Sequence, residues 1–351
     1  MTEKLRVVMG TVYPYDESRI RGGVEAVAFY LTQALAKRDD LELHVVSCNR
    51  TLHPHVVHAQ GFSEYALAAS SRDCLLLAVH GVEAMVPHMR NIAHYQGATG
   101  AYRRWIAPWI AAQSIRNARG IISNAGGYIT DLLAGQLAGK AVYSVFNPVA
   151  DDFFELGNGQ ADPSPIILWV GNISERKDVV GLIQAFASVS RHVPQARLRI
   201  VGGNSEPMYF ERVKREIVNC GLEAVVDLVG RIEQTSLLKE YSAAMVVALS
   251  SIEETAPMAV AQAMAAGKAV VSTRVGGTPW MVEDGVTGCL VDVGDISGMT
   301  DRMLELLQNK DKRERMGRAA RQTALERFSA DGVAEKTAQA YRDLFERRRQ
   351  G

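Results

Sequence analysis

The sequence has little of what marks several protein classes. Its 351 residues include four cysteines (Cys48, Cys74, Cys220 and Cys289) with no CxxC pair, which excludes a cysteine zinc site and indicates a reducing compartment. Lys plus Arg number 39 and Asp plus Glu also 39, so no net charge steers the chain toward nucleic acid. The chain contains no run of about 18 apolar residues that would predict a membrane-spanning helix. The charged start, residues 1–10, does not look like a signal peptide.

What is present is ordinary globular composition, with 47% apolar and 22% charged residues. This composition excludes an intrinsically disordered chain, a collagen-like chain and a coiled coil. At about 100–200 residues per domain, the length predicts two domains with separate cores.

Short apolar runs alternate with longer amphipathic ones. Residues 6–9 and 43–47 are predicted strands that flank a helix at 23–37, and further strands are expected at 75–79 and 120–123. This alternation predicts a parallel sheet with covering helices.

A linker follows, and then the alternation restarts. Residues 158–165, NGQADPSP, lack periodicity and contain Gly, Asp and two Pro, as is typical of a linker. We therefore predict an α/β protein with two doubly wound, Rossmann-like domains at 1–155 and 164–328. A final helix at 331–349 should return to the first domain. Ligands of such sheets bind at the carboxyl ends of the strands.

The first candidate motif begins at Glu254 and follows a predicted strand at 246–249. Thr255 is expected to cap a helix at 258–266, with Pro257 in its first turn. Free amides at such a helix start favour a phosphate, and the Glu254 carboxylate could accept hydrogen bonds from sugar hydroxyls. On the local pattern alone, an ordinary capped helix is the favoured interpretation.

Two further loops join a strand to a helix. Residues 171–178, GNISERKD, place Lys177 where it could neutralise a diphosphate, although a solvated charged turn explains the same pattern. Residues 21–25, RGGVE, carry paired glycines that would let a ligand approach the backbone. Neither loop is the GxGxxG fingerprint, so binding of NAD has little support.

A histidine, His80, ends the predicted strand at 75–79 and should face the ligand edge of the first sheet. His55 and His58 belong to a different strand end, and no HExxH pattern is present, so no metal site is predicted. A surface or structural histidine is the alternative interpretation.

Taken in order, these motifs resemble the retaining nucleotide-sugar glycosyltransferases of the GT-B fold, in the group called glycosyltransferase family 4 or glycosyl transferases group 1. The most specific stretch is 254–288, ETAPMAVAQAMAAGKAVVSTRVGGTPWMVEDGVTG. It resembles the Glu-x7-Glu signature of the family, with its Val-Gly-Gly loop and Glu-Asp-Gly-x-Thr-Gly turn. The RGGVE loop, the strand end at His80 and the Val-Gly-Arg-Ile segment at 229–232 resemble other parts of the family pattern.

The resemblance implies a role for each matching residue. His80 and Glu254 would be catalytic, with His80 at the 6-hydroxyl and Glu254 on the donor sugar. The remaining implied residues bind the donor: Gly22, Gly23, Asn172, Arg176, Lys177, Ile232, Thr255, Ala256, Pro257, Met258 and Gln262. The resemblance implies sugar transfer with retention, no metal and no cofactor, because Lys177 and helix amides would hold the diphosphate.

Two residues depart from the family pattern. Gln262 stands where the second Glu of the signature would grip the ribose, and Asn172 replaces an Arg of the diphosphate clamp. Arg176, Arg21 or Arg274 could supply that charge instead. These departures leave open a catalytically weak, glycosyltransferase-like binding or scaffold subunit. A third alternative is another GT-B enzyme, such as an epimerase or a phosphorylase.

The acceptor is expected to be a saccharide or a lipid-linked saccharide, in assembly of a bacterial surface polysaccharide, lipopolysaccharide or glycolipid. Basic and aromatic residues interleave over 85–119, as on helices that lie at a membrane surface. We expect a cytoplasmic protein, and this pattern is compatible with peripheral contact to the inner face of the membrane. A partly buried helix with a solvated rim is the slightly favoured interpretation.

Overall fold

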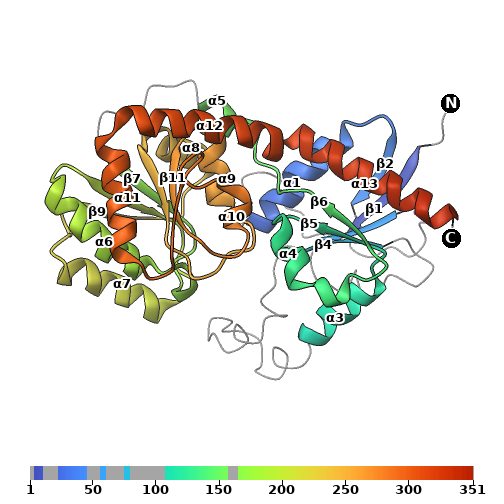
Figure 1. The fold of residues 1–351 in the computed structure, drawn as a ribbon, viewed down its shortest axis with the longest axis horizontal. Helices are drawn as coiled ribbons and strands as arrows, with labels where there is room; N and C mark the ends of the chain where they lie inside the picture. Colours follow the sequence, from blue (N-terminus) through green and yellow to red (C-terminus); the bar gives the residue numbers. More distant parts are fainter. Residues whose placement is uncertain are drawn as a thin grey trace. The chain divides into compact units, whose positions relative to one another are not determined.

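The structure is a computed structural model, and it describes residues 4–10, 23–45, 56–60, 75–79, 107–156 and 165–350. The chain divides into two compact units (Figure 1). The first contains residues 1–148 together with 329–351, and the second contains 149–328.

The first unit is built on a six-stranded sheet in the order β2-β1-β3-β4-β5-β6, with all strands parallel. Strand β4 is buried throughout and purely aliphatic, as expected of a strand covered on both faces. The strands are β1 (Leu5–Gly10), β2 (Leu41–Val45), β3 (Val56–Gln60), β4 (Leu75–Val79), β5 (Gly120–Ser123) and β6 (Ala141–Ser144). The helices include α1 (Gly23–Ala36), α3 (Ala107–Asn117), α4 (Gly127–Leu132) and α13 (Ala330–Gln350).

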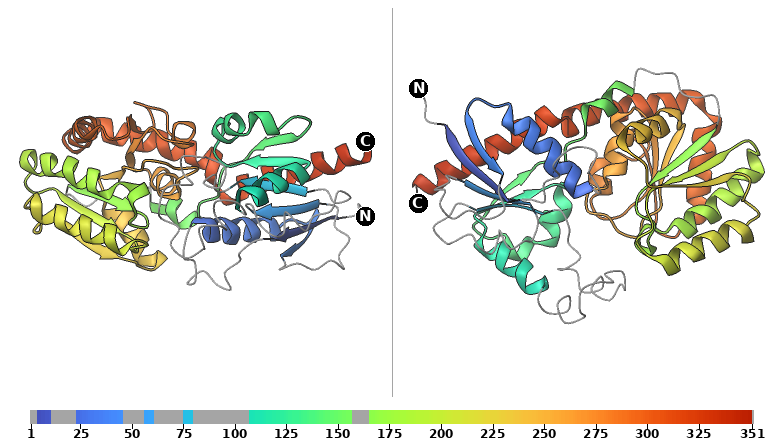
Figure 2. Two further views of the ribbon diagram at one scale, coloured as in Figure 1. Left: turned by 90° about the horizontal axis from the view of Figure 1, so that it is seen from below. Right: turned by 180° about the vertical axis from the view of Figure 1, so that it is seen from behind.

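Helix α13 packs beside α1 on this sheet, although some 300 residues separate them in sequence (Figure 2). Its apolar side chains share one core with α1 and β1. Tyr341 is fully buried, and its hydroxyl lies 2.5 Å from Nδ1 of His58 on β3.

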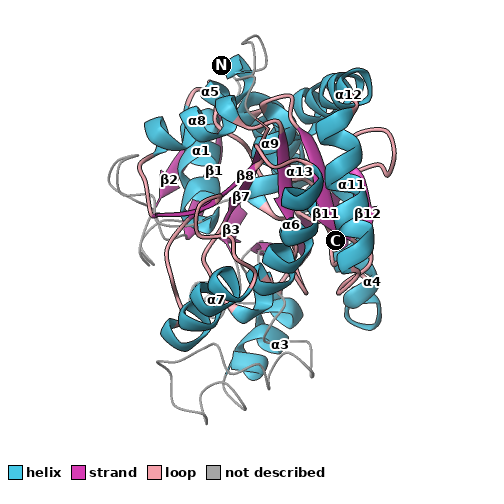
Figure 3. Ribbon diagram, turned by 90° about the vertical axis from the view of Figure 1, so that its left-hand side faces the viewer, coloured by secondary structure: helices cyan, strands magenta, loops and turns pink. Residues whose placement is uncertain are grey.

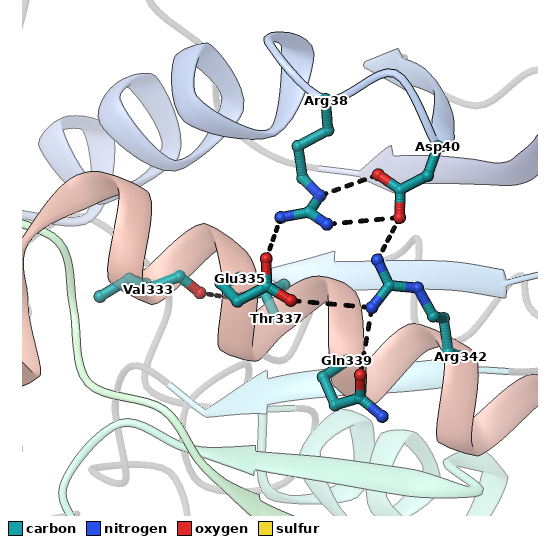
Figure 4. Close-up of polar contacts among 7 residues, drawn as sticks. All are labelled: Arg38, Asp40, Val333, Glu335, Thr337, Gln339 and Arg342. Carbon is teal, nitrogen blue, oxygen red and sulfur yellow. Dashed lines mark hydrogen bonds and ion pairs between the residues drawn. The ribbon is translucent and has the colours of Figure 1, made fainter.

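An ion-pair network at the surface also joins α13 to the end of α1 (Figure 4). Arg38 contacts Asp40 at 3.0 Å and Glu335 at 2.5 Å. Arg342 binds Asp40 and lies 3.7 Å from Glu335. Helix α13 is therefore held by buried apolar contacts on one face and by ion pairs at the surface.

The second unit has its own six-stranded parallel sheet, in the order β12-β11-β10-β7-β8-β9 (Figure 3). The strands are β7 (Ile166–Val170), β8 (Arg197–Val201), β9 (Val226–Gly230), β10 (Val246–Leu249), β11 (Ala269–Thr273) and β12 (Cys289–Val291). The helices are α5 (Asp151–Leu156), α6 (Val179–His192), α7 (Pro207–Asn219), α8 (Gln234–Ala243), α9 (Met258–Ala265), α10 (Thr278–Met281), α11 (Ile296–Gln308) and α12 (Lys310–Phe328).

Helices cover both faces of the second sheet. The apolar stripes of α6, α7 and α11 share a core with alternate residues of the central strands, including Ile167 and Trp169 of β7. Helices α8 and α9 pack with α5, and α9 also packs with α12. The alternation of residues between two cores is the pattern expected of a doubly wound sheet.

The α/β class and the parallel, doubly wound sheets predicted from the sequence are confirmed. One boundary differs from the prediction, which placed residues up to 155 in the first domain. Phe153 of α5 packs edge-to-face on Tyr241 of α8, with ring centroids 5.3 Å apart. Residues 149–156 therefore belong with the second unit, because an amphipathic turn joins whichever core buries its aromatic side chains.

Candidate functional site

The candidate site lies at the carboxyl end of the second sheet, where its strand order reverses. Strand β7 pairs with β8 on one side and with β10 on the other. Doubly wound sheets generally bind ligands at such a reversal of strand order. The loop after β7 carries Arg176 and Lys177, and the loop after β10 carries Glu254.

Glu254 is the centre of this site, and its side chain is 7% exposed. Lys177 Nζ donates to Oε1 in a short ion pair, and Ser251 Oγ donates to the same oxygen at 2.7 Å. Arg176 Nη1 lies 3.5 Å from Oε2. The two loops lie together because both follow adjacent parallel strands.

The charge state of Glu254 is set by two opposing effects. Burial raises the pKa of this carboxyl, but the charges of Lys177 and Arg176 and the hydrogen bonds from Lys177 and Ser251 outweigh it. The net pKa lies below the ordinary value. Glu254 is therefore an anion near neutral pH, and both of its carboxylate oxygens can accept hydrogen bonds.

Hydrogen bonds to backbone carbonyls join the two loops to each other. Arg176 Nη1 donates to the carbonyl of Glu253 at 2.7 Å, and the Arg176 carbonyl accepts from the amide of Ile252 at 2.8 Å. Ser250 Oγ donates to the carbonyl of Lys177 at 2.9 Å. The loop that carries Arg176 and Lys177 is therefore held in place by hydrogen bonds to the loop that carries Glu254.

Asp178 ends the first loop in a left-handed conformation, with φ 43°. Its side chain accepts from the amide of Gly181 at 3.1 Å and caps α6. A non-glycine residue in this region carries strain that the surrounding contacts must offset. The strained cap turns the chain sharply directly after Lys177.

The turn after Glu254 differs from the expectation in one respect. Pro257, not Thr255, is the N-cap residue of α9, and no side chain caps the helix. Thr255 and Pro257 are buried, while Ala256 and Met258 are partly exposed. The amide of Gly277 donates to the Glu254 carbonyl at 3.2 Å, so the Val-Gly-Gly loop supports this turn where a threonine cap was expected.

Gln262 lies on α9, and its side-chain oxygen accepts from the Tyr241 hydroxyl at 3.1 Å. Burial raises the pKa of Tyr241, which keeps this hydroxyl protonated and able to donate. Gln262 is partly exposed.

The other sequence candidates fall in three places. Asn172 is exposed and follows β7, and Ile232 is half-buried and follows β9, both at the same sheet edge. Gly23 begins α1 in the first unit. His80 and Gly22 lie outside the described residues, as does Arg21.

Ser251 and Thr273 belong to the site although the sequence did not single them out. Ser251 bonds Glu254 directly, and its carbonyl accepts from Thr273 Oγ1 at 2.6 Å. Both follow or end a buried strand at the ligand edge, which is the signal that could have identified them.

Over the described ranges, no group of three or more His, Cys, Asp or Glu side chains is arranged to hold a metal ion. No helix in that part of the chain is long and apolar enough to cross a membrane.

The family model described as "Glycosyl transferases group 1" matches residues 153–323, which lie within the second unit. N-acetyl-alpha-D-glucosaminyl L-malate synthase of Bacillus anthracis is 30% identical over 186 residues, covering 53% of this chain and 47% of that protein. D-inositol 3-phosphate glycosyltransferase of Corynebacterium aurimucosum is 33% identical over 184 residues, with 51% and 43% covered. The chain thus spans about half the length of these curated relatives.

The likeness in fold extends over nearly the whole chain. The crystal structure of Anabaena HepE in complex with UDP superimposes with a TM-score of 0.74, covering 97% of this chain and 100% of that one at 17% identity. Two parallel six-stranded sheets with covering helices are the two Rossmann-like domains of the GT-B fold. Because the match lies within the unit that holds Glu254 and Lys177, that second unit belongs to the glycosyl transferases group 1 family.

Proposed function

We propose that this protein is a retaining glycosyltransferase that moves a sugar from a nucleoside-diphosphate donor to an acceptor hydroxyl. The observation that carries the proposal is the buried Glu254 carboxylate, paired with Lys177 at the strand-order reversal of a family domain. HepE, a neighbour in fold, was crystallised with UDP, which supports a donor of this class.

In the proposed reaction, the bond from the anomeric carbon to the diphosphate oxygen breaks and a bond to the acceptor oxygen forms on the same face. The acceptor hydroxyl transfers its proton to the departing diphosphate oxygen. Lys177 and Arg176 would stabilise the charge that develops on the diphosphate. Glu254 and the amides of the turn at 255–258 would orient the donor, with Gln262 near the ribose.

We further propose that the reaction needs no divalent metal, because Lys177 and Arg176 supply the positive charge. Activity measured in excess EDTA should match activity in Mg²⁺ to within about twofold, since a required metal contributes several kcal/mol to the transition state. Loss of turnover on chelation, with recovery on adding Mg²⁺ or Mn²⁺, would contradict this.

For the acceptor we propose a saccharide or lipid-linked saccharide of bacterial surface polysaccharide or glycolipid assembly, reached at the inner face of the membrane. Trp109 on α3 is 56% exposed, and its indole suits a membrane interface. A second candidate is a small polar acceptor, favoured by the relatives whose names specify L-malate and inositol 3-phosphate. Radiolabel transfer to each acceptor class, with and without vesicles, separates the two.

The proposal as a whole is tested with a panel of UDP-, GDP-, ADP- and TDP-sugars. At least one donor should raise the melting temperature and undergo slow hydrolysis. Binding without any hydrolysis or transfer would favour the alternative of a weak binding or scaffold subunit.

His80, which lies outside the described residues, has its own test. His80→Ala should lower turnover by about a hundredfold or more, the usual cost of one transition-state donor, while donor binding changes little. Full activity in this variant would assign the histidine a structural role.

A further inference from the structure

The ligand edge of the second sheet holds another cation, Arg231, directly after β9. Its side chain is exposed, and within the described part of the chain it makes no ion pair. The other cations at this edge each face a carboxylate. Lys177 and Arg176 both face Glu254, and Arg274 binds Asp284 at 2.8 Å. Among the described residues, no carboxylate therefore offsets the positive charge of Arg231.

A β-bulge in β9 sets the direction of the Arg231 side chain. Ile200 pairs with Leu228, but Val201 pairs with Gly230, so Val229 is an extra residue in β9. Gly230 then adopts φ 79°, and its carbonyl accepts from the amide of Gly202 at 2.9 Å. Bulges at the end of a strand re-aim the side chain that follows, and the left-handed φ requires glycine.

The bulge directs the Arg231 guanidinium over the backbone of Gly203, after β8. A Cβ atom at Gly203 would lie 3.4 Å from Nη2 and 3.6 Å from Nε of Arg231. The same point is 3.5 Å from Oδ1 of Asn172. Arg231 and Asn172 thus flank a bare stretch of backbone, with their polar atoms at most about 7 Å apart.

These three residues follow β7, β8 and β9, which are neighbours in the sheet. All lie at the edge that carries Lys177 and Glu254. The glycine leaves room for a ligand to approach the backbone, the amide offers donors and an acceptor, and the guanidinium offers a planar fork that fits phosphate oxygens.

We propose that Arg231 binds the phosphates of the donor's nucleoside diphosphate, with Asn172 as its uncharged hydrogen-bonding partner. This inference rests on the proposed function, because it names a further residue of the same donor site. It assigns the charge that Asn172 lacks to a residue two strands away. Arg231 would act together with Lys177 and Arg176, whose charges Glu254 partly offsets. Arg274, which the sequence also offered for this role, binds Asp284.

The test compares binding of the preferred nucleoside diphosphate with binding of its nucleoside, by calorimetry. Arg231→Gln should weaken the diphosphate at least about tenfold, as expected for loss of charge-assisted bonds, and leave the nucleoside nearly unchanged. Arg215→Gln, which removes an exposed arginine from α7, is the matched control and should change neither.

A second variant tests the partnership and guards against a folding defect. Adding Asn172→Arg to Arg231→Gln should restore most of the lost affinity, because the new guanidinium arises at the neighbouring position. Absence of rescue in a folded double variant, unchanged diphosphate binding, or equal loss for nucleoside and diphosphate would each overturn the inference. If the wild-type protein binds no nucleotide, the proposed function fails and the inference fails with it.

Discussion

Glu254 is a residue whose contributions to folding and to chemistry can be measured with one isosteric change. Glu254→Gln keeps an acceptor for Ser251 but removes the charge that Lys177 and Arg176 face. We expect a loss of about 1.5–3 kcal/mol in unfolding free energy at pH 7, the range for hydrogen bonds to charged groups. Urea unfolding measures this loss, and sugar transfer should fall about a hundredfold or more.

The same variant predicts a pH dependence with a definite sign. The pKa of Glu254 is lower in the folded protein than the ordinary value. Its ionised form therefore stabilises the fold fully above about pH 4.3, and this contribution is lost as pH falls through the folded pKa. The stability gap between wild type and Glu254→Gln should narrow at pH 3.5. An equal gap at both pH values would show that the charge is not its source.

Gln262 gives a second prediction for a single side chain. A carboxylate at this position would still accept the hydrogen bond from the Tyr241 hydroxyl. In the proposed donor complex it would also accept charge-assisted hydrogen bonds from the ribose hydroxyls. Gln262→Glu should tighten the preferred nucleotide several-fold in calorimetric titration. Weaker binding would mean that the pocket is built around the amide, and Tyr241→Phe, which removes the existing partner, is the control.

At the scale of elements, packing reverses the usual effect of a helix glycine. Replacing an interior glycine by alanine normally stabilises a helix by about 1 kcal/mol. At Gly317 on α12, however, a Cβ atom would lie 2.1 Å from the carbonyl oxygen of Gly267, which follows α9. The glycine lets the two backbones touch.

We therefore expect Gly317→Ala to destabilise the protein by about 1–3 kcal/mol, the cost of overpacking. Denaturant unfolding gives the value directly. The adjacent, exposed Arg318→Ala should stay within about 0.5 kcal/mol of wild type. A stabilised Gly317→Ala variant would show that α12 shifts freely against the end of α9.

At the scale of the whole molecule, the chain returns to the first unit after completing the second. Two units with separate cores are expected to unfold in separable steps. Tyr341→Ala should lower the stability of the first unit by about 3–5 kcal/mol, because this ring is fully buried. Arg342→Ala, in the exposed network of Figure 4, should cost under about 1 kcal/mol.

Scanning calorimetry distinguishes the units. Tyr341→Ala should shift one transition and Glu254→Gln the other, since these residues belong to different units. A single transition that both variants shift equally would mean that the two units unfold together.

Much of the fold follows from local pattern. The aliphatic run of β7 predicts a strand, because a strand buried on both faces is apolar at every position. The apolar spacing of α6 predicts a helix, because a helix buried on one side has apolar residues every three to four positions. Strands β4, β5 and β10 have the bounds that the sequence predicted, 75–79, 120–123 and 246–249. The sequence motifs alone also predict that Glu254 and Lys177 follow the ends of strands.

Other features depended on contacts between distant segments. The pairing of Gln262 with Tyr241, the replacement of the Thr255 cap by Pro257 and the side to which α5 belongs are examples. The bulge that places Arg231 over Gly203 and beside Asn172 is another. The periodicity of residues along the chain indicates which face of its own helix or strand each residue occupies. Which strand ends become neighbours, and which charges offset one another there, is decided only when the sheet assembles, because those interactions join residues that have no periodic relation along the chain.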